Sequence, residues 1–174
     1  MSNPEDAKRQ LNGDKAIAKV RELLPGFQSA MVVTHTRAGE VHARPLALQG
    51  DLSRFGGVLW FFTDMRSRKI EEAADCAPIS VICQNDDKGI YLHLTGSVTV
   101  VRDLSKMREL YSPLLKTWFP KGLDDPFLTL IKFEAAGGAY WDSPGGLLHG
   151  LASFAKSVAT GTPGLGGETG DLHL

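Results

Sequence analysis

Cysteine is scarce in this chain, and the short motifs that mark common catalytic and metal sites are missing. Only Cys76 and Cys83 are present, and both lie in apolar surroundings. Two cysteines without a CxxC spacing favour reduced core side chains over a disulfide or a metal pair. The sequence also contains no HExxH, GxSxG or GxxxxGK[ST] motif, so no motif predicts a metalloprotease, a serine hydrolase or a P-loop site.

Long apolar runs and an excess of positive charge are lacking too. No apolar segment approaches the roughly 20 residues needed to cross a bilayer. The first residues, MSNPEDAKRQLNGDK, lack the apolar centre of a secretory signal. The net charge is −1, whereas a general nucleic-acid binder is usually clearly basic. We therefore expect a cytoplasmic protein that binds neither membranes nor nucleic acid.

The 174 residues, of which 43% are hydrophobic and 22% charged, fit one globular domain. We expect a flexible polar lead over residues 1–13 and a folded domain over residues 14–158. The Gly-rich tail over residues 159–174 has no apolar periodicity, so we expect it to be extended, either disordered or lying on a partner subunit.

Most of the expected elements are strands joined by short turns. Apolar periodicity predicts a helix that begins at Asp14 and ends at Pro25-Gly26, and further helices at 67–74, after Asp103 or Ser105, and weakly at 147–158. Strands are expected at 27–36, 41–49, 59–64, 78–84, 90–102, 127–134 and 138–142. This order predicts a mainly β (α+β) fold, a small antiparallel barrel with flanking helices.

Two residues within these strands predict local irregularity. Pro45 lacks a ladder donor, so it must lie at an edge or a bulge. Arg44, just before it, can point into a cleft or stand exposed on a bulged edge strand. Gly96 is expected to mark a bend or bulge in the long strand.

The segment LWFFTDMRSRKIEEAA, from Leu59 to Ala74, changes from a strand to a helix within a few residues. Ser67 stands at the expected N-cap, with Arg68 and Lys69 beside it. A helix start with free N–H groups, a hydroxyl and two cations is suited to hold a phosphate. The alternative is an ordinary N-cap followed by two solvated basic side chains.

Three motifs in this order carry a resemblance to a known family. They are Arg44-Pro45-Leu46, FTDMRSRK at 62–69, and the YWD that closes the last strand at 140–142. The set resembles the general stress protein branch of the pyridoxamine 5′-phosphate oxidase-related flavin-binding split-barrel superfamily, over about residues 14–158. The resemblance implies an antiparallel split β-barrel that forms a homodimer, with shared sites for FMN at the subunit interface.

The resemblance also implies which positions hold the cofactor. The FMN phosphate would be held by Arg44, Ser67, Arg68 and Lys69. The isoalloxazine ring would be lined, largely by backbone groups, by Pro45, Leu46, Phe62 and Thr63. Tyr91 stands where the oxidases have a flavin-contacting Gln, and Trp141 matches a Trp that reaches the cofactor from the same or the other subunit.

The segment after Trp141 departs from the oxidases, which have two substrate- and flavin-binding arginines there. His149 keeps its place, whereas Leu147 and Leu151 stand at the arginine positions. Leucine cannot pair with a substrate phosphate, and an unpaired buried phosphate is costly. We therefore expect that the chain does not oxidise pyridoxamine 5′-phosphate.

The expected function is that of an FMN-binding stress-related flavoprotein, an oxidoreductase on an unidentified small molecule. The flavin would carry the redox chemistry, so no catalytic residue is assigned and no metal is expected. One alternative is a non-catalytic protein that stores or senses flavin. Another is a split barrel that binds deazaflavin or haem, for which haem would require His35, His42 or His149 as a ligand.

Overall fold

The computed structural model describes residues 9–36, 38–66, 79–143 and 168–174. The strands are β1 (Arg9–Asn12), β2 (Ser29–His35), β3 (Val41–Ala47), β4 (Val58–Asp64), β5 (Ile79–Asn85), β6 (Ile90–Val101), β7 (Leu128–Asp142) and β8 (Glu168–His173). The helices are α1 (Asp14–Leu23) and α3 (Leu104–Leu110), with 3-10 turns η2 (Leu24–Gly26), η3 (Leu52–Arg54), η4 (Pro113–Thr117) and η5 (Gly122–Asp124). The expected helices at 67–74 and 147–158 lie outside the described residues.

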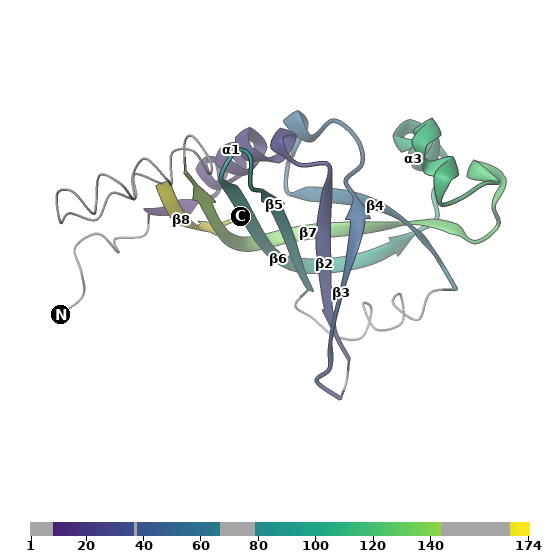
Figure 1. Cartoon of the computed structure of the whole chain (residues 1–174), viewed down its shortest axis with the longest axis horizontal. Helices are drawn as coiled ribbons and strands as arrows, with labels where there is room; N and C mark the ends of the chain where they lie inside the picture. The colour runs from purple at the N-terminus through teal and green to yellow at the C-terminus, as the bar shows by residue number, and fades with distance from the viewer. Residues whose placement is uncertain (1–8, 37, 67–78, 144–167) are drawn as a thin grey trace.

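The described strands form one sheet in the order β1-β8-β7-β6-β5-β2-β3, and β4 pairs separately with β7. Strands β6 and β7 run through the molecule from the side of α1 to the side of α3 (Figure 1). Edge strand β3 and strand β4 approach where the Gln49 N–H donates to the Trp60 carbonyl oxygen at 3.2 Å. The fold is therefore mainly β, an antiparallel split barrel with flanking helices, as the sequence predicts.

Local signals in the sequence account for several of these boundaries. Helix α1 ends where Pro25 and Gly26 form η2. Asp103 caps α3, because its side chain accepts hydrogen bonds from the N–H groups of Ser105 and Lys106. Pro45 lies in edge strand β3, and the register of β6 against β7 shifts between Thr95 and Gly96. The predictions for these positions are confirmed.

The prediction of two closing strands at 127–134 and 138–142 is wrong, because β7 is a single strand of 15 residues. Strand β7 pairs with β6 from Leu130 to Asp142, with one register shift. Because of this pairing, the strand stays continuous through the small residues near its middle. A Cβ on Gly138 would overlap the His93 carbonyl oxygen of β6. Gly138, expected as the first residue of a second strand, is needed within β7 for the close approach of two backbones.

Both ends of the domain also differ from expectation. Residues 9–12, expected within a flexible lead, form β1, which pairs in parallel with β8. Strand β8 belongs to the tail expected to be extended, either disordered or lying on a partner subunit. It is extended, but it pairs antiparallel with β7 of the same chain. Leu172 of β8 is 1% exposed in the main core. Strands β1 and β8 are polar in composition, and they are held in the sheet by backbone hydrogen bonds and by one buried leucine.

A group of charged side chains ties α1 to these strands. Lys19 Nζ lies 2.8 Å from Asp142 Oδ2 and 3.8 Å from Glu168 Oε2. Glu168 Oε1 accepts hydrogen bonds from the Tyr140 hydroxyl and from Arg9 Nη1, each at 2.7 Å. Burial of Lys19 pulls its pKa down, but the hydrogen bond and charge of Asp142, with the other carboxylates, raise the pKa above its ordinary value. The group therefore joins α1, β1, β7 and β8 through ion pairs and hydrogen bonds.

The apolar residues form two clusters. The main cluster lies between α1 and the inner face of the sheet, and the second lies beneath α3 and includes Phe62, Met107 and Leu110. Cys83 is free and buried in the main cluster, and burial raises the pKa of its thiol to about 12. The prediction of a reduced core cysteine is confirmed for Cys83, whereas Cys76 lies outside the described residues. No helix within the described ranges is long and apolar enough to span a bilayer.

Replacing Lys19 with Met should lower the free energy of unfolding by about 2 kcal/mol, the scale of a charge-assisted hydrogen bond. The substitution leaves Asp142 and Glu168 without their shared cation. Lys15→Met is the matched control, because Lys15 is exposed on the same helix. Urea unfolding followed by circular dichroism measures both, and equal stability of the two variants would contradict the assigned role of Lys19.

Candidate functional site

Strand β3 presents Arg44 and Leu46 on one face and Pro45 on the other. Arg44 lies opposite Val32 and Leu46 opposite Ala30, and both partners are 3% exposed. The even positions therefore face the core side of the sheet. Arg44 is partly buried, which places a cation at the edge of the barrel and not on its outer surface.

Strand β4, which approaches β3 at the Gln49–Trp60 hydrogen bond, carries the next two predicted residues. Phe62 is 5% exposed within the cluster beneath α3, and Thr63 is 8% exposed opposite Thr129. Their side chains are packed within the protein. A ligand at this position would meet mainly backbone groups, as the resemblance implies.

An ion pair that the sequence reasoning did not include shapes the end of β4. Asp64 Oδ2 lies 2.6 Å from Arg66 Nη2, and Asp64 Oδ1 accepts from the Arg66 backbone N–H at 2.8 Å. The guanidinium also lies 4.0 Å from the centroid of the Phe127 ring. These bonds from Arg66 hold the pKa of the Asp64 carboxyl below its usual value. Arg66 is thus engaged within the chain just before Ser67, Arg68 and Lys69, which lie outside the described residues.

Tyr91 and Trp141 lie directly opposite each other on β6 and β7. They are 38% and 40% exposed. The Tyr91 hydroxyl donates to Asp86 Oδ1 at 2.9 Å, which raises the pKa of the phenol and fixes the direction of the ring. The two predicted aromatic residues therefore form one open pair.

This aromatic pair belongs to a larger apolar surface on the outer face of the sheet. Met31 is 39% exposed and Ile82 is 41% exposed, and the two are opposite each other on β2 and β5. Pro45 lies opposite Met31 on β3. We call these five residues, Met31, Pro45, Ile82, Tyr91 and Trp141, the outer patch. Gln84 stands opposite Tyr91 and His93 opposite Ile82, so the outer patch consists of two apolar groups on one face of the sheet. Exposed apolar side chains of this kind mark interaction surfaces.

Two of the predicted site residues, Thr63 and Trp141, lie far apart within one chain. Thr63 pairs with Thr129 near the start of β7, whereas Trp141 stands twelve residues further along the same strand (141 − 129). At about 3.3 Å per residue, this is roughly 40 Å of strand. Figure 1 shows that these two ends of β7 lie on opposite sides of the molecule. Trp141 therefore cannot touch a ligand that is bound at Thr63 of the same chain.

No cluster of three or more potential metal-ligating side chains occurs within the residues that the structure describes.

The fold of the described residues is that of an antiparallel split β-barrel with flanking helices. A sequence model of the family described as "Pyridoxamine 5'-phosphate oxidase like" matches residues 15–163. Because this match spans most of the chain, the protein belongs to that family.

Individual proteins are also similar to this chain. Protein bli-3 of Neurospora crassa is 26% identical over 93% of this chain and 84% of its own length. The crystal structure of a candidate general stress protein 26 from Jannaschia sp. CCS1 is 25% identical, with a TM-score of 0.72 over 90% of this chain and 96% of that one. The general stress FMN/FAD binding protein of Xanthomonas citri is 22% identical, with a TM-score of 0.61 over 75% of this chain and 90% of that one.

Proposed function

We propose that this protein binds FMN in two sites of a homodimer, and that each site combines β3 and β4 of one chain with Tyr91 and Trp141 of the other. The observation that carries the proposal is the separation of the family's cofactor positions along β7, together with the exposure of the aromatic pair. The family match and the fold shared with a protein named for FMN/FAD binding support a flavin as the ligand.

Features near β3 fit the cofactor's phosphate. Arg44 supplies a partly buried cation on the core side of the sheet. Thr34, opposite His42 and two residues from the Arg44–Val32 pair, has a buried hydroxyl with no hydrogen-bond partner among the described residues. Such a buried donor is a position where a bound polar group is expected. Ser67, Arg68 and Lys69 would complete the set of donors around the phosphate.

The outer patch supports the dimer. Its large apolar side chains are each about two-fifths exposed in the single chain and would be buried by a second copy. A symmetric pair would place Trp141 of one chain against β3 and β4 of the other, which no arrangement within one chain can do. Bound FMN would supply the redox chemistry, so the protein's own task is to hold and orient the ring.

For the activity, we propose a stress-related oxidoreductase in the cytoplasm, acting on a small molecule other than pyridoxamine 5′-phosphate. The likeness to the Jannaschia protein supports the stress-related part. The leucines at 147 and 151 support the exclusion of a phosphorylated pyridine substrate.

The phosphate assignment predicts a difference between two flavins. Lys69→Ala should weaken FMN binding about 10- to 100-fold, the range for one charge-assisted hydrogen bond, and should leave riboflavin binding nearly unchanged because riboflavin lacks the phosphate. Fluorescence titration of both flavins measures this, with the exposed Lys116→Ala as the control. Equal losses for FMN and riboflavin would show that Lys69 does not bind the phosphate.

The shared site predicts complementation between two defective chains. Lys69→Ala and Trp141→Ala, each weak in FMN binding alone, should regain one intact site when they are refolded together. In the mixed dimer one site has both defects, and the other combines Lys69 of one chain with Trp141 of its partner. Titration of the mixture should recover FMN binding at the wild-type affinity. A mixture that binds no better than its two components would contradict a site formed between chains.

A further inference from the structure

The chain after α3 lies at the end of the molecule away from α1 and β8 (Figure 1). We call residues 113–121, which begin with η4, the tip. Its backbone is fixed, because the N–H groups of Trp118 and Phe119 both donate to the Leu115 carbonyl oxygen, at 3.1 and 2.8 Å. The Leu115 side chain is 4% exposed in the apolar cluster beneath α3, and Phe119 packs against that cluster. The tip is therefore held from below by the protein itself.

Two large apolar side chains of the tip extend away from this packed base. Leu114 is 75% exposed and Trp118 is 65% exposed, more than any other large hydrophobic residue that the structure describes. Pro113 and Pro120 beside them are exposed as well. Single exposed apolar side chains are common on protein surfaces, but several on one fixed segment indicate an interaction surface.

The charges of the tip have one sign. Lys116 and Lys121 are exposed, and they are the only charged residues in the sequence from Tyr111 to Leu123. Neither lysine forms an ion pair with any residue within the described ranges. Because the whole chain has a net charge of −1, the tip is a local excess of positive charge.

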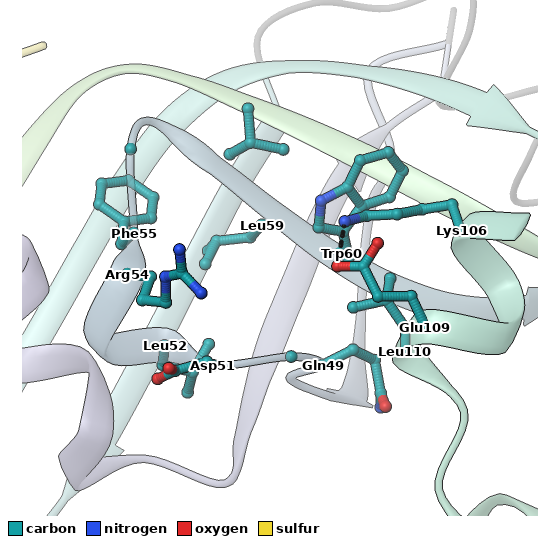
Figure 2. A pocket seen from close by; sticks show the side chains of 13 residues that line it. Gln49, Asp51, Leu52, Arg54, Phe55, Leu59, Trp60, Lys106, Glu109 and Leu110 are labelled. Atoms are coloured by element: carbon teal, nitrogen blue, oxygen red, sulfur yellow. Dashed lines mark hydrogen bonds and ion pairs between the residues drawn. The ribbon is translucent and has the colours of Figure 1, made fainter.

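The charged side chains nearer to β4 are balanced within the protein. A cavity of about 360 Å³ lies between the loop that holds η3, strand β4 and helix α3, and Figure 2 shows Lys106 and Glu109 paired at its α3 wall. Lys106 Nζ lies 2.7 Å from Glu109 Oε1. On the loop, hydrogen bonds from Ser53 and the charge of Arg54 hold the pKa of the Asp51 carboxyl below its usual value. The lysines of the tip differ from these groups, because their charges are left for a partner.

We propose that the tip docks the protein on a membrane surface that contains anionic lipids. Trp118 and Leu114 insert at the level of the headgroups, where an amphipathic indole ring is favoured. Lys116 and Lys121 lie against the negative charges of the lipids. A protein partner fits less well, because lysine is depleted at the centre of protein–protein interfaces and here two lysines flank the tryptophan. Two apolar side chains and two cations give weak and reversible attachment.

The features that predict no membrane binding do not bear on such a contact. The lack of a long apolar run excludes a spanning helix, and the net charge describes the whole chain, whereas a surface contact depends on one segment. No tip residue is among those assigned to the flavin. The tip packs near the start of β7 through Leu115 and Leu128, and Trp141 lies at the other end of that strand. Docking therefore does not rest on the proposed function.

The test is sedimentation of the full chain with vesicles, made either of phosphatidylcholine alone or of phosphatidylcholine and phosphatidylserine in equal amounts. Wild-type protein should bind the anionic vesicles about tenfold or more tightly, because each lysine near such a surface contributes about fivefold, and high salt should remove this difference. Trp118→Ser should weaken binding to the anionic vesicles by about tenfold or more, and Leu114→Ser should weaken it as well. Lys116→Gln combined with Lys121→Gln should bind both kinds of vesicle nearly equally.

Val41→Ser and Lys15→Gln are the matched controls, because both residues are exposed outside the tip, and both variants should bind like wild type. Circular dichroism checks the fold of each variant. Three results would overturn the inference: no binding of the wild type to anionic vesicles, equal binding to both kinds of vesicle, or unchanged binding of Trp118→Ser. A change in the oligomeric mass of lipid-free Trp118→Ser would also overturn it, because the tip would then be a contact between copies of the chain.

Discussion

Strand β7 forms backbone hydrogen bonds with three neighbours, and their arrangement fixes the layout of the whole molecule. Strand β6 accompanies it from Leu130 to its end, β4 pairs with its first half, and β8 pairs with its second half. The position of Gly138 against the His93 carbonyl lets the strand continue through its centre. Because β7 extends from its pairing with β4 to its pairing with β8, the residues near β4 and the aromatic pair near β8 lie far apart.

The charged group around Lys19 stabilises the end of this arrangement that carries Trp141. Asp142, next to Trp141, pairs with Lys19 of α1, and Glu168 connects Tyr140 with Arg9 of β1. Single surface ion pairs contribute little, but this lysine is largely buried and shared by several carboxylates. Within the outer patch, Trp141 therefore lies next to a residue that an ion pair ties to α1.

Most of the strands could be predicted from local pattern alone. Alternating burial accounts for β2 and β5, the proline in β3 indicates an edge, and Gly96 marks the irregularity in β6. The continuity of β7 could not be predicted, because its reason is the close approach of a neighbouring strand. Strands β1 and β8 were missed because their residues are mostly polar and their pairing is between the two ends of the sequence.

The candidate site, like the fold, depends partly on local sequence patterns and partly on contacts between segments that are distant in the sequence. The sequence placed the motif residues on the strands that became β3 and β4, and their role as a site stays a prediction. The Asp64–Arg66 pair could have been predicted from its two-residue spacing at a strand end. The distance between Thr63 and Trp141 depends on the register of β7 against its neighbouring strands. This register could not be predicted, because the sequence indicated two separate strands in place of β7. The cavity brings together residues 49–60 and 106–110, and no local motif relates a loop to a helix so far along the chain.

The central claim is that a complete flavin site requires two chains, and sedimentation equilibrium with detection at the flavin absorption band tests it most directly. We expect bound flavin to sediment only with the mass of a dimer. Ile82→Asp, which places a charge in the outer patch, should reduce the dimer and the bound flavin together. Flavin that remains bound to a monomer, in the wild type at micromolar concentration or in Ile82→Asp, would contradict the claim.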